Sequence, residues 1–125
     1  MKVAVIGSRD LIISDLESFI PKECSEIVSG GAVGVDLCAA EFAKKKKMNL
    51  VEFLPNYKKY GRSAPIVRNK QIVEYSDEVL AFWNGKSKGT LSVIRYCEKT
   101  GTPCRVIVKE DLKWVNSYVN LLDSE

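Results

Sequence analysis

Anion-binding chemistry is indicated most strongly by one run of the chain, Ser29-Gly30-Gly31-Ala32-Val33-Gly34-Val35-Asp36. Its three glycines let backbone N–H groups approach an anion without interference from a Cβ atom. The run joins an apolar segment to a predicted helix, whose start supplies unpaired N–H groups and the positive end of the helix dipole. Asp36 could cap that helix or bind a ribose hydroxyl. We therefore expect Gly30, Gly31, Gly34 and Asp36 to contact a phosphate-containing ligand.

Two further loops carry similar residues after an apolar run. Gly7, Ser8 and Arg9 follow the run Val3 to Ile6, and the Arg9 guanidinium can hold a phosphate through two hydrogen bonds. The other loop opens a predicted helix and offers amide, hydroxyl and backbone groups. Its candidate ligand-binding residues are Asn84, Gly85, Ser87, Gly89 and Thr90. Thr90 is also a helix-capping residue type, and capping is compatible with phosphate contact.

Basic residues precede the fourth apolar run. Arg68 and Asn69 fall in the first turn of a predicted helix, roughly 5 Å along its axis from Pro65, so both can face the same crevice. Arg68 is the one candidate for a catalytic residue. Residues 55–64, which include Arg62, combine basic residues with two tyrosines, a composition typical of a lid over a base or a phosphate chain. An ordinary solvated loop fits this composition equally well.

Several of these side chains have a structural alternative. Arg9 could form a surface ion pair with Asp10, and Arg68 could be a solvated helix residue. Trp83 ends an apolar run and could either stack on a ligand ring or pack in the core. One glycine loop is weak evidence for a site, whereas three polar loops that meet at one place favour an anion-binding crevice.

The chain offers few residues for catalysis. It has no histidine, which excludes Ser-His-Asp and Cys-His catalysis and leaves acid-base chemistry to carboxylates, Tyr, Lys or Cys. Its four cysteines show no CxxC spacing, so we predict no metal site and expect reduced thiols. Cys38 and Cys97 are expected to pack on helix faces as small apolar residues.

The elements that must position these residues alternate along the chain. Apolar runs predict strands at 2–6, 26–29, 50–54, 78–83 and 104–108, and helical patterns predict helices at 14–20, 36–47, 65–75, 90–100 and 111–122. The third and fifth predicted strands each carry a charge, so we place them at the edges, in the order 3-2-1-4-5. We thus predict a Rossmann-like three-layer α/β/α fold with a five-stranded parallel sheet.

Helix signals support these boundaries. Asp36 and Thr90 are predicted N-caps, Pro65 suits a first helical turn, and Gly101 follows the end of the fourth helix. In a parallel sheet the loops at 7–10, 30–36, 55–63 and 84–90 share one rim. The chain reverses direction between the first and fourth strands, and open α/β sheets bind ligands at such a switch point.

Composition sets the broad class. With 125 residues, 46% hydrophobic and 28% charged, the chain is expected to form one domain over 1–125. The net charge of +3 is mild, and the run Lys44 to Lys47 is expected to be the solvated end of a helix. No apolar window is long enough for a membrane span and no signal peptide is evident, so we expect a cytoplasmic protein with no membrane contact.

Taken in order, the motifs resemble the YspA-like branch of the SLOG superfamily, which is named after the DNA-processing protein Smf and the Lonely Guy enzymes. The resemblance covers about residues 1–108. It rests on Gly7-Ser8-Arg9, the run 29–36, Tyr60-Gly61-Arg62-Ser63-Ala64, Arg68-Asn69, Ser76-Asp77 and the run 81–90. It implies a Rossmann-like fold whose glycine loops bind nucleotides or nucleotide derivatives.

The resemblance offers two alternative activities. Lonely Guy enzymes cleave the base-ribose bond of nucleoside monophosphates with a helix arginine, to which Arg68 is similar, and a glutamate in a GGxGTxxE motif. Val93 stands in the place of that glutamate here, which argues against phosphoribohydrolase activity. Smf-like proteins bind single-stranded DNA. In that case the contacting residues would be Tyr57, Lys58, Lys59, Tyr60 and Arg62.

We therefore predict that the protein binds a nucleotide or a phosphate-containing nucleotide derivative at the carboxyl rim of the sheet, as a sensor or binding protein. Single-stranded DNA ranks below a small ligand because the net charge is low. No cofactor beyond that ligand is implied. The sequence leaves open whether the protein is a nucleotide N-glycosidase. It also leaves open a homodimer, since the predicted helix 111–122 could be core or dimer surface.

Overall fold

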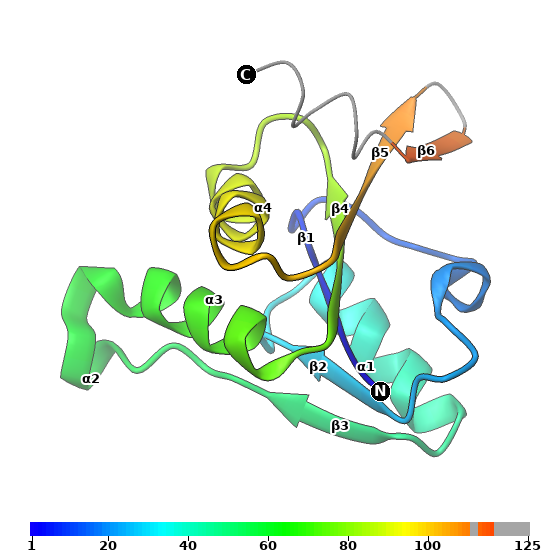
Figure 1. The fold of residues 1–125 in the computed structure, drawn as a ribbon, viewed down its shortest axis with the longest axis horizontal. Coiled ribbons are helices and arrows are strands. Elements are labelled where there is room, and N and C mark those ends of the chain that lie inside the picture. Colours follow the sequence, from blue (N-terminus) through cyan, green and yellow to red (C-terminus); the bar gives the residue numbers. More distant parts are fainter. Residues whose placement is uncertain (111–112, 117–125) are drawn as a thin grey trace.

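A computed structural model describes residues 1–110 and 113–116 of the chain. Its centre is a six-stranded sheet in the order β3-β2-β1-β4-β5-β6 (Figure 1). The strands are β1 (Lys2–Gly7), β2 (Glu26–Ser29), β3 (Asn49–Glu52), β4 (Glu78–Trp83), β5 (Cys104–Glu110) and β6 (Lys113–Asn116). Strands β1 to β5 pair in parallel, so the predicted order 3-2-1-4-5 is confirmed. Strand β6 pairs antiparallel with β5.

Helices cover both faces of the sheet. The α-helices are α1 (Val35–Lys45), α2 (Tyr57–Tyr60), α3 (Ala64–Tyr75) and α4 (Lys88–Thr100), and the 3₁₀ helices are η1 (Leu16–Phe19) and η2 (Gly61–Ser63). Side chains of η1 and α1 pack on one face, and side chains of α3 and α4 pack on the other. This is the predicted Rossmann-like arrangement of three layers.

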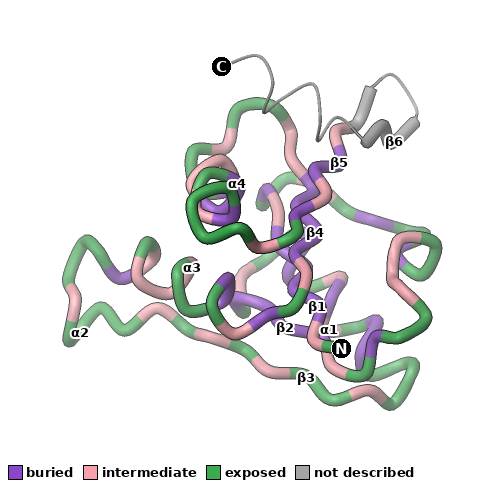
Figure 2. Tube along the Cα trace, in the orientation of Figure 1, coloured by how far each residue is buried: buried purple, intermediate pink, exposed green. Residues whose placement is uncertain are grey.

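The two cores follow from the two-residue period of the strands. Val3 and Val5 of β1 belong to the core under α1, whereas Ala4 and Ile6 belong to the core under α3 and α4. All four are buried, as are most residues of β2 and β4 (Figure 2). A strand that is apolar on both faces needs helices on both faces, and α1, α3 and α4 provide them.

Four predictions about these elements differ from the structure. The helix predicted at 111–122 is wrong where the structure describes it, because residues 113–116 form β6; residues 111–112 and 117–122 lie outside the described residues. Strand β6 also covers β5, so the strand at 104–108 is not an edge as predicted. The helix predicted at 14–20 is only the short 3₁₀ helix η1. A loop was expected at 55–64, but α2 and η2 occupy most of it.

The carboxyl ends of the parallel strands meet at one rim. There the loop after β1 is tied to the end of β4: the Ser8 N–H donates to the Phe82 carbonyl oxygen at 3.0 Å, and the Asn84 N–H donates to Ser8 Oγ at 3.1 Å. These bonds close the switch point at which the chain reverses direction across the sheet. Among the helices of the described residues, none combines the length and apolar character that a membrane crossing requires.

Candidate functional site

A crevice of about 270 Å³ opens at this rim, between the ends of β1 and β2 and the first turns of α3 and α4. Its walls combine charged, polar and apolar groups from segments far apart in the sequence. The lining residues are Ile6, Gly7, Arg9, Gly30, Ala32, Asp36, Pro65, Arg68, Asn69, Ser87, Gly89, Thr90 and Val93. Nine of them are candidate residues of the sequence analysis, so the predicted convergence of loops at one rim holds for these nine.

The first turn of α4 forms one wall. Ser87 is the N-cap, and its Oγ accepts a hydrogen bond from the Thr90 N–H at 3.3 Å. The predicted cap, Thr90, lies instead inside the helix; it is buried, and its hydroxyl donates to Ser87 Oγ at 3.2 Å. The wall therefore presents a helix start with two hydroxyl groups and the exposed Gly89, an arrangement suited to an anion.

Asn84 and Gly85, also predicted to contact a ligand, do not line the crevice. The Asn84 side chain shapes the loop: its Oδ1 accepts hydrogen bonds from the N–H groups of Lys86 and Ser87 at 2.9 and 2.8 Å. Its Nδ2 donates to Asp10 Oδ1 at 3.0 Å. Asn84 thus holds the start of α4 in place.

The start of α1 forms the opposite wall. The N-cap is Gly34, not Asp36 as predicted, and no side chain caps this helix. Asp36 lies two residues further along, in the first turn of the helix, where its Oδ2 accepts the N–H of Ala32 at 3.1 Å and only 7% of its surface is exposed. The glycine loop therefore directs a backbone donor at the protein's own carboxylate, which adds a hydrogen-bond acceptor to this wall.

Burial raises the pKa of the Asp36 carboxyl group, because a charged carboxylate is poorly solvated there. The Ala32 N–H and the charge of Arg68 oppose this effect, whereas the charge of Glu52 adds to it. Among residues 1–110 and 113–116, Asp36 is the only acidic residue that lines the crevice.

Arg68 closes the floor between these walls. Its Nη1 donates to the Gly30 carbonyl oxygen at 2.7 Å, and its Nε donates to Asn69 Oδ1 at 2.8 Å. Asn69 in turn donates to Ser92 Oγ at 3.4 Å. Burial lowers the pKa of the Arg68 guanidinium and the charge of Asp36 raises it. Arg68 is thus a fixed cation rather than the solvated helix residue of the alternative interpretation.

Arg9 is the exposed cation of the crevice. Its side chain makes no hydrogen bond or ion pair with any residue that the structure describes, so the alternative pair with Asp10 is absent there. The neighbouring Ser8 is buried and holds β1 to β4, as described above, and it does not line the crevice.

The remaining residues with a predicted ligand contact do not line the crevice. Gly31 packs near Leu54, and Arg62 is exposed on η2. Trp83 donates from Nε1 to the Ser87 carbonyl oxygen at 2.9 Å and packs against the core under α3 and α4, which favours its structural role. Four lining residues were not predicted to contact a ligand: Ile6, Ala32, Pro65 and Val93, of which Val93 was named only as the residue in the place of the Lonely Guy glutamate.

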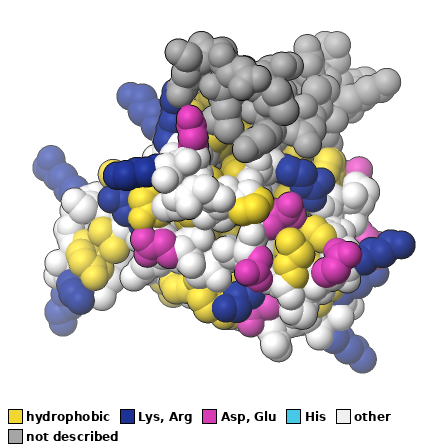
Figure 3. Space-filling model, in the orientation of Figure 1, with side chains coloured by type: hydrophobic (Ala, Val, Ile, Leu, Met, Phe, Trp, Pro, Cys, Tyr) yellow, Lys and Arg dark blue, Asp and Glu magenta, His cyan; other side chains and the backbone are white. Residues whose placement is uncertain are grey.

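A second hollow of about 270 Å³ adjoins the crevice, and Arg68 lines both. It lies beside α2 and brings in Lys59 and Tyr60 from the segment predicted to be a lid. The face shown in Figure 3 carries projecting Lys and Arg side chains at its left margin, on the side of α2, α3 and α4.

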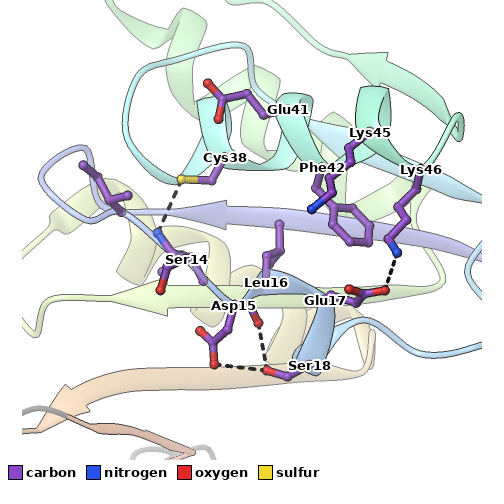
Figure 4. A pocket seen from close by; sticks show the side chains of 12 residues that line it. Ser14, Asp15, Leu16, Glu17, Ser18, Cys38, Glu41, Phe42, Lys45 and Lys46 are labelled. Carbon is purple, nitrogen blue, oxygen red and sulfur yellow. Dashed lines mark hydrogen bonds and ion pairs between the residues drawn. The ribbon is translucent and has the colours of Figure 1, made fainter.

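A larger hollow, about 730 Å³, lies away from the rim between η1 and α1 (Figure 4). Two of its charged groups form an ion pair, because Lys46 Nζ lies 2.5 Å from Glu17 Oε1. Ser18 Oγ donates to the Asp15 carbonyl oxygen at 2.8 Å. The Ile13 N–H donates to Cys38 Sγ at 3.4 Å. Unlike the rim crevice, this hollow is lined by three carboxylates against two lysines and by no residue from the first turn of an α-helix.

The cysteines do not form a site in the described part of the chain. All four are free thiols. Cys97 is a buried residue of α4, as expected, whereas Cys38 is half-buried beside the larger hollow. Within residues 1–110 and 113–116, no group of three or more Cys, Asp or Glu side chains could hold a metal ion.

Comparison with known proteins gives one informative likeness. Neither a family model nor a curated protein sequence matches the chain. The solved structure of DNA processing protein A from Helicobacter pylori, described for its single-stranded DNA binding mode, is similar with a TM-score of 0.71. The match has 24% sequence identity and covers 99% of this chain and 72% of that chain. At this identity the likeness establishes the shared Rossmann-like fold.

Proposed function

We propose that the rim crevice binds a nucleotide through its phosphate and sugar. The observation that carries this proposal is the meeting of Arg9, Arg68, Asp36 and the start of α4 around one crevice of about 270 Å³. Cations and a helix start suit a phosphate, and a buried carboxyl group suits a ribose hydroxyl. A site with only one of these features would fit many ligands, whereas the combination fits a nucleotide.

Each group has a distinct role in this proposal. The phosphate lies beside Arg9 and the first turn of α4, where Gly89 leaves the backbone open and Thr90 offers a hydroxyl group. Asp36 accepts a hydrogen bond from the sugar. Arg68, already bonded to the Gly30 carbonyl oxygen, contributes positive charge from a fixed position. The apolar side chains of Ile6, Pro65 and Val93 offer a surface for the base.

Calorimetric titration tests this proposal. AMP, ADP and ADP-ribose should bind, and adenosine, which lacks the phosphate, should bind at least tenfold more weakly. Arg9→Ser should weaken AMP binding by about tenfold or more, because a charge-assisted hydrogen bond is lost. Lys44→Ser removes one exposed charge on α1, far from the crevice, and should leave the affinity unchanged. No binding of any of these compounds at millimolar concentrations would overturn the proposal.

A second candidate function, single-stranded DNA binding, is favoured by a separate observation. The hollow with Lys59 and Tyr60 adjoins the crevice at Arg68, and cations interleaved with aromatic rings suit an unpaired strand. The structural neighbour is itself described as a single-stranded DNA binder.

Anisotropy of a labelled oligothymidylate distinguishes this function. Binding should weaken steeply with salt, and Lys59→Ser and Tyr60→Leu should each reduce the affinity for the oligonucleotide more than the affinity for AMP. Absence of binding at low salt would exclude the DNA function and leave the small-ligand proposal intact.

A further inference from the structure

A groove of about 350 Å³ runs between α3 and α4, which lie side by side in Figure 1. Its lining residues are Ile66, Asn69, Lys70, Ser92, Arg95, Tyr96 and Lys99. Asn69 lines both this groove and the rim crevice, and its Nδ2 donates to Ser92 Oγ in the groove at 3.4 Å. The groove therefore adjoins the crevice at Asn69.

The groove is long because it follows two helix faces. The residues from α4 are spaced 92, 95, 96 and 99, and those from α3 are spaced 66, 69 and 70, which is the spacing of one face of each helix. From Ser92 to Lys99 the helix advances roughly 10 Å, at about 1.5 Å per residue. An extended ligand that leaves the crevice can therefore continue along this path.

Positive charge flanks the groove on both sides. Lys70 of α3 and Arg95 and Lys99 of α4 are exposed. The nearby acidic residue Glu74 is engaged, because its Oε2 accepts the Tyr96 hydroxyl at 2.5 Å. Lys70, Arg95 and Lys99 line the groove and no acidic residue of the described chain does, so the groove is a match for a negatively charged chain.

The floor of the groove supplies an aromatic and an apolar surface. The ring of Tyr96 is half-buried, with Lys70 Nζ 5.5 Å from its centre, and Ile66 is 54% exposed. The hydrogen bond from the Tyr96 hydroxyl to Glu74 holds the Tyr96 ring in place. Fixed rings between cations are how proteins bind unpaired bases and the phosphates between them.

We propose that the groove between α3 and α4 holds the nucleotides that follow, in a single strand, the nucleotide bound in the rim crevice. This inference rests on the proposed function, because the crevice anchors the strand. Asn69 lies where the two sites adjoin, and the positive charge of the groove selects a phosphodiester chain. The groove is a separate surface from the hollow beside α2, and it extends the site in a different direction along α3.

Length dependence of binding tests the inference. The probes are thymidine monophosphate and labelled oligothymidylates of two, four and eight nucleotides, with oligouridylates as a second series that distinguishes DNA from RNA. Affinity should rise at least tenfold from the monophosphate to four nucleotides.

Removing positive charge from the groove should weaken the binding of oligonucleotides but not that of the monophosphate. The double variant Arg95→Ser/Lys99→Ser should reduce the affinity for four nucleotides by tenfold or more and reduce the salt slope by about 1.4, since each phosphate contact contributes about 0.7. It should leave the affinity for the monophosphate unchanged. The control Lys22→Ser/Lys44→Ser removes the same charge from exposed residues outside the groove and should keep most of the oligonucleotide affinity.

A ring substitution provides an independent readout. Tyr96→Leu should lower the oligonucleotide affinity by about fivefold to 150-fold, the equivalent of losing one stacked base. Tyr96→Phe keeps the ring and should retain the affinity. Thermal unfolding of each variant, followed by circular dichroism, verifies that the helices remain packed.

The outcomes separate the two proposals. If the monophosphate binds but longer strands bind no more tightly, or the double variant behaves like its control, the groove inference is overturned and the proposed function stands. If an acidic peptide such as polyglutamate competes as well as the oligonucleotide, the groove is not a nucleic-acid surface and the inference is likewise overturned. If no probe binds, both proposals fall.

Discussion

Arg68 Nη1 donates a hydrogen bond to the Gly30 carbonyl oxygen at 2.7 Å and thereby joins the first turns of α3 to the glycine loop after β2. A Cβ atom added to Gly30 would lie 2.6 Å from Arg68 Nη1 and 3.0 Å from Asp36 Oδ2. The absence of a Cβ atom at Gly30 thus lets two charged side chains approach the backbone, and not a ligand alone. This relationship explains why the loop is tight at this position.

Gly30→Ala should therefore destabilise the protein by about 1–3 kcal/mol, since overpacking displaces Arg68 and Asp36. The matched substitution is Gly89→Ala, where the nearest atom to an added Cβ is Ser87 Oγ at 4.0 Å. It should not destabilise the protein. Urea unfolding measures both, and equal losses of stability would contradict the steric argument.

Gly34→Ala combines backbone strain with a clash. Gly34 has φ 73° and ψ −123°, and an added Cβ would lie 2.3 Å from the Arg9 carbonyl oxygen. Gly61 has a similar backbone, φ 56° and ψ −131°, with nothing within 4 Å of an added Cβ. Gly61→Ala should cost about 1–3 kcal/mol from strain, and Gly34→Ala should cost about 1–3 kcal/mol more. Comparable unfolding free energies of the Gly34→Ala and Gly61→Ala variants would show that the contact with Arg9 is unimportant.

The raised pKa of Asp36 predicts a pH dependence of stability. Its carboxyl group binds a proton more tightly in the folded than in the unfolded chain, so its contribution is fully present below the unfolded pKa of about 3.9 and is lost as the pH rises through the folded value. Asp36→Asn removes this loss. The unfolding free energy of the variant, relative to the native protein, should therefore increase between about pH 4 and pH 7.

Glu23→Gln is the control for this measurement, because Glu23 is exposed. Its unfolding free energy should follow that of the native protein across the same pH range. A pH-independent difference between Asp36→Asn and the native protein would show that burial does not disfavour the charged form of Asp36.

Incubation with AMP should release no adenine. Hydrolysis of the base-ribose bond needs a group that activates water and a group that stabilises the developing cation, and Asp36 is the only acidic residue of the described chain that lines the crevice. Val93, which lines the crevice where the Lonely Guy motif has glutamate, cannot take either role. Chromatography of the reaction mixture measures the free base. Release that Asp36→Asn abolishes would instead identify an enzyme.

Much of the fold was predictable because its local signals agree. The run 78–83 is apolar at every residue but one and was predicted as a strand within the sheet, which is β4. The position of Gly101 after the fourth helix is typical of a left-handed cap, and its φ is 78°. Pro65 lies in the first turn of α3, as its missing N–H allows.

The wrong predictions concern choices that local spacing cannot make. Residues 113–116 were assigned to a helix because apolar residues recur there at helical spacing, but they pair with β5 as β6. Asp36 and Thr90 are capping residue types, yet Gly34 and Ser87 are the caps. Several neighbouring residues can begin a helix, and the contacts of the preceding loop select one of them.

The sequence by itself determined that glycine-rich loops meet at one rim, because alternating strands and helices with short connections require parallel strands whose carboxyl ends share an edge. Only the tertiary structure decided which loop residues face the crevice and which hold it together. Ser8 and Asn84, 76 residues apart, bond to each other, and Arg68 reaches Gly30 across 38 residues. Such bonds depend on the register of neighbouring strands and helices, which the spacing of residues along the chain does not contain.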